Sequence, residues 1–319
     1  MSGIVAAHGP FDPDLGQRML SRLVHRGPDG EGSRRVGDSW LGHRRLAIVD
    51  LEHGGQPLGN RAGDLWLVGD GGLYNHDRLR AELGDERFHS RSDHEAALHL
   101  FDDEGVGAFE RLWGEFAFAL AGDDDRFVAT RDTLGVAPLY WARRGDTVVF
   151  ASELKAFDED WRSEIEPFPP GHAWTPQDGL RAWRPSPTAA PVLMRSLGPD
   201  EDPPPWVFAA IRDSLIRAVE RELVADVEVG VFLSGGVDSS IVTAIAARAA
   251  ERSGARIKTF AAGLPDSADL IAARAVADHA GTDHHERVYT AEEAIALLPE
   301  VIALPIMPAP YSAVLRPLM

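Results

Sequence analysis

Short apolar runs separated by turns rich in Gly and Asp fill the first part of the chain. Runs of this length between turn residues are typical of strands, and the polar stretch at 142–146 between two of them predicts a hairpin turn. The predicted strands lie within residues 3–9, 40–50, 65–70, 116–132 and 138–152.

Two helices are predicted between these strands. One begins near an Asp-Pro pair and places Leu15, Met19 and Leu23 four residues apart on one face. The other runs from Ser92 past Leu98. The first part is therefore predicted to be an α+β domain.

Strands and helices alternate in the second part of the chain. The predicted order is a helix at 206–224, a strand at 227–233, a helix at 239–253, a strand at 257–263 and a helix at 268–281. This alternation is typical of an α/β doubly wound parallel sheet. Two parallel strands alone would leave exposed edges and an uncovered face. We therefore expect a partner polypeptide, a second copy of the chain or further strands to cover this partial sheet.

A proline-rich segment separates the two parts. Seven of the 22 prolines lie between Arg184 and Pro205, and neither a helix nor a central strand tolerates that density. The sequence thus predicts a first domain at residues 1–183, a linker at 184–205 and a partial second domain at 206–319.

Composition excludes several classes of chemistry. The 319 residues carry 32 basic and 50 acidic side chains, a net charge of −18, which disfavours binding to nucleic acid or to an anionic membrane. The absence of cysteine excludes disulfides, thiolate zinc sites and a cysteine nucleophile. The first residues lack a signal-peptide pattern and no apolar run is long enough to span a bilayer, so a cytoplasmic location is expected.

A loop rich in Ser and Gly joins the strand at 227–233 to the helix that follows. A strand, a tight turn and a helix start direct free backbone N–H groups toward an anion. The candidate binding residues are Leu233, Ser234, Gly235, Gly236, Val237, Asp238, Ser239 and Ser240. The Gly-Lys-Ser/Thr of the Walker loop is missing. The loop resembles instead the SGGxDS loop of ATP pyrophosphatases, which implies binding of ATP and adenylation of a carboxylate. Asp238 is the candidate Mg²⁺ ligand.

Further ordered stretches extend this resemblance over nearly the whole chain. Residues 257–290 resemble the next segment of the asparagine synthetase branch, which places Ala262 beside the adenine. The first domain resembles the glutamine amidotransferase domain of asparagine synthetases. The stretches that carry the resemblance are 2–9, 25–32, 41–50, 71–76, 92–93, 131–135, 138–140, 151–155 and 168–171.

The resemblance implies a four-layer αββα sandwich with a nucleophile at the processed N-terminus. Ser2 then stands at the nucleophile position, with Asp70 and Gly71 as further catalytic positions. Arg45 matches the clamp of the glutamine carboxylate, and Asp93 matches a partner of the glutamine ammonium. The remaining implied glutamine-binding positions are Leu46, Ile48, Val49 and Gly72.

Three positions depart from the family pattern. The family uses Cys where this chain has Ser2, and Asn-Gly-Glu where it has Asp70, Gly71 and Gly72. A hydroxyl is a weaker nucleophile than a thiolate. An ionised Asp can only accept hydrogen bonds, so it would repel the oxyanion that the Asn amide stabilises. We therefore expect a weakened or inactive glutaminase.

The sequence thus predicts an ATP- and Mg²⁺-dependent ligase similar to asparagine synthase. Its substrates would be ATP, aspartate or another carboxylate, and glutamine or ammonia. A homo-oligomer or a partner subunit is expected, without nucleic acid or membrane. One alternative is an intramolecular ligase resembling β-lactam synthetases. Another is a non-catalytic paralogue that binds ATP or an amino acid, or one subunit of a split enzyme.

Overall fold

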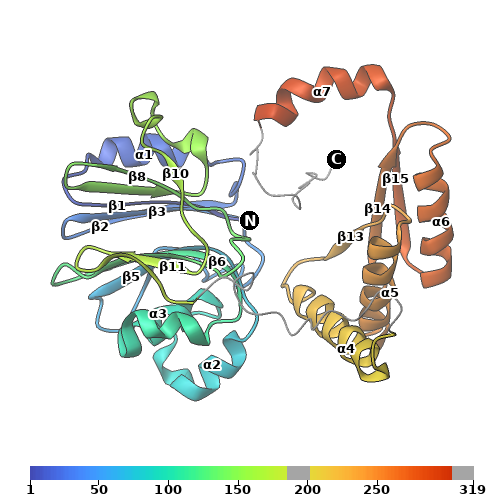
Figure 1. Ribbon diagram of the computed structural model, residues 1–319, viewed down its shortest axis with the longest axis horizontal. Coiled ribbons are helices and arrows are strands. Elements are labelled where there is room, and N and C mark those ends of the chain that lie inside the picture. The colour runs from blue at the N-terminus through green and yellow to red at the C-terminus, as the bar shows by residue number, and fades with distance from the viewer. Residues whose placement is uncertain (185–201, 304–319) are drawn as a thin grey trace. The chain divides into compact units, whose positions relative to one another are not determined.

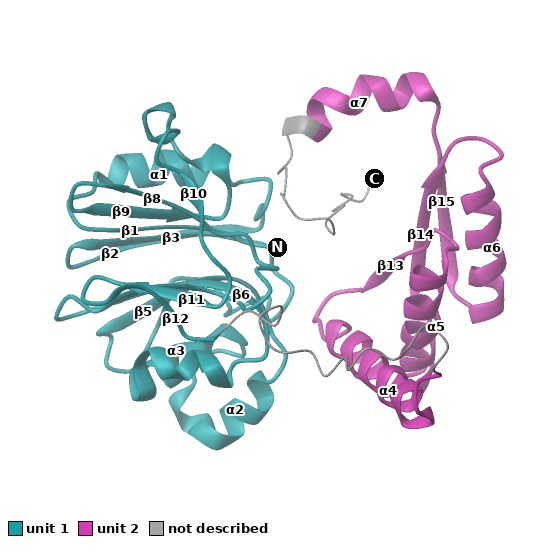
Figure 2. Ribbon diagram, viewed as in Figure 1, with its two compact units in different colours: residues 1–193 teal, residues 194–319 magenta. Residues whose placement is uncertain are grey.

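The chain folds into two units, residues 1–193 and residues 194–319 (Figures 1 and 2). This computed structural model describes residues 1–184 and 202–303. Among the helices in those two ranges, we find none with the length and apolar character needed to cross a membrane.

Two antiparallel sheets of six strands each form the centre of the first unit. The first sheet has the order β10-β8-β9-β1-β3-β2, and the second has the order β12-β11-β7-β6-β5-β4. The first sheet consists of β1 (Gly3–His8), β2 (Gly30–Val36), β3 (Ser39–Arg45), β8 (Tyr140–Arg144), β9 (Thr147–Ala151) and β10 (Glu166–Pro167). The second consists of β4 (Leu58–Gly59), β5 (Leu65–Leu73), β6 (Gly114–Gly122), β7 (Phe127–Arg131), β11 (His172–Thr175) and β12 (Gly179–Ala182).

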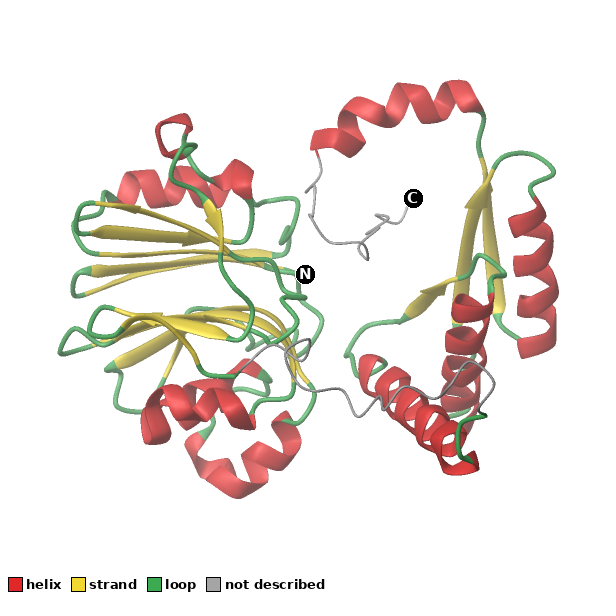
Figure 3. Cartoon of the chain, in the orientation of Figure 1, coloured by secondary structure: helices red, strands yellow, loops and turns green. Residues whose placement is uncertain are grey.

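Helices cover the outer faces of both sheets (Figure 3). Helix α1 (Pro13–Ser21) packs on β1 and β3, and its start is fixed by Asp12, whose side chain accepts a hydrogen bond from the N–H of Asp14. Helix α3 (His94–Glu104) lies on the second sheet, and α2 (His76–Leu83) packs against α3. The predicted four-layer αββα sandwich is confirmed. Four short 3₁₀ segments complete the unit, at Asp85–Arg87, Gly105–Arg111, Leu154–Ala156 and Glu159–Trp161.

Three apolar clusters hold the layers together. One lies between the sheets around Phe150 and Phe168, one lies under α1 around Met19, and one lies between the second sheet and α3 around Phe109. Because both of its faces are covered, every residue of β1 is buried. This double burial fixes the start of β1, and with it Ser2, at one end of the sandwich.

A parallel three-stranded sheet forms the second unit, in the order β13-β14-β15. Its elements are α4 (Pro205–Glu222), β13 (Gly230–Phe232), α5 (Val237–Arg252), β14 (Lys258–Gly263), α6 (Ala268–Ala280), β15 (Asp283–Val288) and α7 (Ala291–Ala303). The expected alternation of strands and helices is confirmed. Helix α6 ends at Gly281, which adopts the left-handed conformation that glycine favours.

The two-stranded sheet expected from the sequence is a three-stranded one. Strand β15 was missed because its sequence, Asp-His-His-Glu-Arg-Val, shows no apolar alternation. Its contact with β14 is polar: Thr259 Oγ1 of β14 lies 2.9 Å from His284 Nδ1 of β15 and 2.8 Å from the Oγ1 of Thr282, just before β15. Helix α7 was also not foreseen.

Candidate functional site

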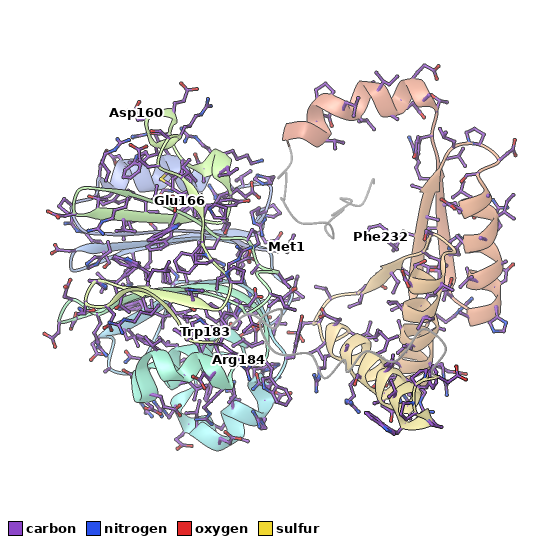
Figure 4. All side chains as sticks on the ribbon, in the orientation of Figure 1. Met1, Asp160, Glu166, Trp183, Arg184 and Phe232 are labelled. Carbon is purple, nitrogen blue, oxygen red and sulfur yellow. The ribbon has the colours of Figure 1, made fainter. Side chains whose placement is uncertain are left out.

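The first candidate site is built around Ser2, immediately before β1. Figure 4 shows the neighbouring Met1 at the end of the sandwich. The Ser2 hydroxyl accepts a hydrogen bond from the Leu46 N–H at 3.2 Å, and the Ser2 carbonyl accepts one from Arg26 Nε at 2.6 Å. The Ile4 N–H donates to Ser152 Oγ at 2.9 Å, which fixes the strand just beyond. Ser2 is therefore held by both its backbone and its hydroxyl.

A buried ion-pair cluster lies directly behind Ser2. Arg26 is 4% exposed, Asp70 is fully buried and Glu153 is 5% exposed. Arg26 Nη2 lies 2.7 Å from Asp70 Oδ2, and Arg26 Nη1 lies 3.1 Å from Glu153 Oε1. Burial acts to lower the pKa of Arg26, but the charges of the two carboxylates raise it overall. Arg26 is thus a permanent cation that links Ser2 to two carboxylates.

Glu153 has a second neighbour in His25, whose Nε2 lies 3.0 Å from both carboxylate oxygens. Burial acts to raise the pKa of Glu153, but the His25 hydrogen bond and the Arg26 charge hold it below its ordinary value. At the other end of the cluster, burial lowers the pKa of the N-terminal amine of Met1. The charge of Asp70 is the largest effect that opposes this shift.

Asp70 and the two glycines after it occupy the end of β5. Gly71 has φ of +111°, and a Cβ there would lie 1.9 Å from the Glu115 carbonyl oxygen, so only glycine fits. Gly72 is different, because the nearest atoms to a Cβ would be Asp93 Oδ2 at 3.9 Å and Tyr74 Cε1 at 4.0 Å. A Cβ at position 72 would therefore meet no obstruction.

Arg45 ends β3 and holds the loop that follows. Its guanidinium donates to the carbonyls of Val49 at 3.2 Å, of Leu51 at 3.0 Å and of Asp50. A guanidinium has five N–H groups, so two of them remain after these three bonds. The loop that Arg45 closes carries Leu46, Ile48 and Val49, of which Ile48 is exposed.

Asp93 stands at the start of α3 and is tied to β5, because its Oδ2 accepts a hydrogen bond from the Leu73 N–H at 2.7 Å. The next residue, His94, reaches the Gly71 carbonyl at 3.2 Å through Nε2. Its Nδ1 lies 3.0 Å from Gln56 Nε2. These contacts fix the backbone on both sides of Gly72.

His43 lies in β3 behind this network and is almost fully buried. Burial, followed by the nearby positive charges of His94 and Arg45, lowers the pKa of His43 to about 3. Its Nε2 is buried with no hydrogen-bond partner among the residues that the structure describes. His43 is therefore a neutral side chain of the interior rather than an acid or a base at neutral pH.

The second candidate site is the loop between β13 and α5. Gly235 has φ of +80°, and a Cβ there would lie 2.4 Å from Ala272 Cβ and 2.6 Å from the backbone of α6. The Ser234 and Ser239 hydroxyls lie 3.0 Å apart, and the Ser240 hydroxyl donates to the Gly236 carbonyl at 2.7 Å. The loop is thus pressed tightly against α6.

Helix α5 begins at Val237, so the backbone N–H groups of its first turn have no acceptors within the helix. Together with the helix dipole and the exposed hydroxyls, they make an arrangement that suits an anion such as a phosphate. Asp238 is exposed in the same turn, and Ala262 is exposed on β14. Leu233 is buried and anchors the loop.

The structure brings the predicted residues into two groups, one in each unit. The first group is linked through β1, β3, β5 and α3 and consists of Ser2, Leu46, Asp70, Gly71, Gly72 and Asp93. The second group is the loop at residues 233–240 of the second unit. The structure adds Arg26, His25 and Glu153 to the first group, none of which was predicted as a site residue. Their stretches had been noted for the resemblance, and an Arg beside a His before a Gly-Pro turn was the available signal.

Metal ligation has little support from protein groups alone. The described residues contain no cluster of three or more His, Asp or Glu side chains placed to hold a metal ion. Asp238 could supply one carboxylate oxygen, and a Mg²⁺ ion bound there would take its other ligands from phosphate and water.

Comparisons with known proteins match both units. Residues 1–168 match the family model for a glutamine amidotransferase domain, and residues 210–312 match the model for asparagine synthase. "Asparagine synthetase [glutamine-hydrolyzing] 3" of Arabidopsis thaliana is 40% identical over 317 residues, covering 95% of this chain and 53% of the relative. A rice asparagine synthetase is 39% identical, covering 95% and 52%. A probable asparagine synthetase of Dictyostelium discoideum is 41% identical over 302 residues, covering 89% and 53%.

The chain thus spans about half the length of these relatives. Among solved structures, a glutamine phosphoribosylpyrophosphate amidotransferase from B. subtilis overlays on 92% of this chain and 70% of that one, with a TM-score of 0.49 and 19% identity. The chain belongs to the glutamine amidotransferase family, and its second unit matches the asparagine synthase model.

Proposed function

We propose that this chain acts in an ATP-dependent amide-forming ligation of the asparagine synthetase type. The observation that carries the proposal is the loop at residues 234–240, which joins a parallel strand to a helix start and lies within the asparagine synthase match. The relatives that match both units are named asparagine synthetases. Aspartate is accordingly the first carboxylate to test.

The proposed reaction has two steps. A carboxylate oxygen of the acceptor attacks the α-phosphorus of ATP, which forms an acyl adenylate and releases pyrophosphate. A nitrogen nucleophile then attacks the acyl carbon, which forms the amide and releases AMP. In the first step, the N–H groups of Val237 and Asp238 and the hydroxyls of Ser239 and Ser240 would hold the β- and γ-phosphates. Asp238 would supply one ligand to Mg²⁺, which neutralises phosphate charge.

We further propose that the first unit binds an amino acid but hydrolyses glutamine poorly. In glutamine hydrolysis, the nucleophile attacks the side-chain carbonyl and a negative charge develops on its oxygen. Donors aimed at that oxygen stabilise the transition state, and losing one typically costs about 10²–10³ in rate. Asp70 offers a carboxylate at this position, already engaged by Arg26, so it supplies no donor. Ammonia or another amine would then provide the nitrogen.

A second candidate rests on the exposed aromatic side chains of the second unit. Phe232 (Figure 4) is 52% exposed and Phe260 is 36% exposed, and they are register neighbours on β13 and β14. Such a face suits coverage by another polypeptide. The chain would then be one subunit of a split or regulatory assembly, or one copy in a homo-oligomer. A ligase that uses an internal amine, as β-lactam synthetases do, fits the same pair of sites.

The test measures AMP and pyrophosphate release by the purified chain with Mg²⁺, ATP and aspartate, with ammonium in one reaction and glutamine in the other. Turnover with ammonium but not with glutamine is expected. Equal turnover with both would refute the impaired glutaminase. Failure of the folded chain to bind ATP, measured by calorimetry, would refute the proposed role of the loop. If the chain binds ATP without turnover and a second polypeptide restores the turnover, the chain is one subunit of a larger enzyme.

A further inference from the structure

One carboxylate oxygen at the Ser2 site has no partner. Asp70 is fully buried, and its Oδ2 is bound by Arg26 at 2.7 Å. Its Oδ1 is also buried, and within residues 1–184 and 202–303 nothing donates a hydrogen bond to it. Buried carboxylate oxygens are normally paired, because leaving one unpaired costs its full desolvation. The orphaned Oδ1 therefore indicates that a donor is missing from the site.

The local charges indicate that this donor is a cation. Arg26 is shared between Asp70 and Glu153, and Glu153 has a second cation in Lys155, whose Nζ lies 3.5 Å from Glu153 Oε2. Among the ion pairs of the described residues, Asp70 therefore has only a share of the Arg26 charge. His25 also bonds to Glu153. The charge of Asp70 raises the pKa of the N-terminal amine of Met1, and Glu115 and Asp29 raise it further. Burial outweighs these charges and lowers the pKa of the amine overall.

Position 72, two residues after Asp70 in β5, carries no side chain. A Cβ at that position would meet nothing closer than Asp93 Oδ2 at 3.9 Å. Asp93 Oδ2 is engaged with the Leu73 N–H, so the space at position 72 is bordered by a second carboxylate. In the family pattern, position 70 is Asn and position 72 is Glu. Asp70 therefore puts a hydrogen-bond acceptor where the Asn amide would be a donor, and Gly72 removes the Glu side chain.

We propose that the Ser2 site binds an α-amino acid whose side chain ends in a positively charged nitrogen, such as ornithine, lysine or arginine. Its side-chain cation pairs with Asp70 Oδ1, while its α-carboxylate and α-ammonium pair with Arg45 and Asp93. This inference rests on the proposed loss of glutaminase activity and on the proposed amino-acid binding by the first unit. A cation is favoured over the neutral carboxamide of glutamine because charge-assisted hydrogen bonds are about twice as strong as neutral ones.

The experiment measures binding of amino acids to the full chain by titration calorimetry, after mass spectrometry has established whether Met1 is removed. Ornithine, lysine and arginine are compared with glutamine and with norleucine, which lacks only the amino group of lysine. At least one basic amino acid is expected to bind tenfold or more tightly than glutamine, and lysine more tightly than norleucine.

Two variants locate the preference. Asp70→Asn is expected to remove the preference for basic amino acids. Glu153→Gln, which removes the other carboxylate that pairs with Arg26, is expected to leave the preference unchanged. The comparison of lysine with norleucine uses only the unaltered protein, so it decides the matter even if Asp70→Asn does not fold. Equal binding of lysine and norleucine, tighter binding of glutamine, no binding at all, or a preference that survives Asp70→Asn would each overturn the proposal.

These outcomes are independent of the proposed ligase activity. Pyrophosphate release reports on the loop of the second unit, and it can persist when no basic amino acid binds. Glutamate release from glutamine by the unaltered chain would instead refute the impaired glutaminase on which the inference rests.

Discussion

Gly235 provides a sharp test of the loop between β13 and α5. We consider the substitution Gly235→Ala. The residue has φ of +80°, a conformation that costs an L-residue roughly 1–2 kcal/mol. The added methyl would also lie 2.4 Å from Ala272 Cβ and 2.6 Å from the α6 backbone. Overpacking of this kind typically costs about 1–3 kcal/mol, so the unfolding free energy of the second unit is expected to fall by roughly 2–5 kcal/mol.

Gly254→Ala is the matched control. Gly254 has nearly the same conformation, with φ of +76°, but a Cβ there would meet nothing within 4 Å. Gly254→Ala is therefore expected to lower the unfolding free energy only by the roughly 1–2 kcal/mol that the positive φ costs an L-residue. The comparison of the two variants isolates the contact between the loop and α6.

Hydrogen exchange measured by mass spectrometry on peptides from α5 and β14 is the appropriate assay, because it reports opening of the second unit separately from the first. Urea unfolding followed by circular dichroism gives the same difference for the whole chain. If Gly235→Ala loses no more stability than Gly254→Ala, the loop is not pressed against α6 as described.

Three further predictions concern the first unit. Replacing Arg26 with Met leaves the buried Asp70 without its cation, so the unfolding free energy should fall by about 3–5 kcal/mol in urea melts; the exposed pair of Arg212 serves as a control expected to show no change. Gly71→Ala should destabilise strongly and Gly72→Ala hardly at all, because only the first would place a Cβ 1.9 Å from the Glu115 carbonyl; equal melting temperatures would contradict this. His43 titrates near pH 6.5 when unfolded and at about 3 when folded, so its contribution is complete above pH 6.5 and is lost as the pH falls toward 3. At about 1.4 kcal/mol per pKa unit this amounts to roughly 4–5 kcal/mol, and His43→Gln should flatten stability curves measured across that range.

The fold was largely predictable from the sequence because its signals are local. Strands of the first unit alternate with turns, and Gly145 in a polar stretch marks the hairpin between β8 and β9. The three-stranded sheet was not predictable in full. Strand β15 contacts β14 through the ring of His284 and the hydroxyl of Thr259, and such polar pairing leaves no apolar alternation.

The candidate site divides in the same way. Positions that match motifs, such as Ser2 and Asp93, could be named from the sequence. The ion-pair cluster could not, because Arg26 lies 44 residues from Asp70 along the chain and 127 residues from its other partner, Glu153. The packing of the two sheets brings these residues together. The orphaned Oδ1 of Asp70 is likewise visible only once those contacts are known.

The most direct test of the account is a measurement of glutamate release from glutamine by the unaltered chain and by the combined variant Ser2→Cys, Asp70→Asn, Gly72→Glu. We predict only slow release by the unaltered chain. The variant regains the thiolate and the oxyanion donor, so a gain of at least about 10²-fold is expected. Rapid glutamine hydrolysis by the unaltered chain, unchanged in the variant, would contradict the account.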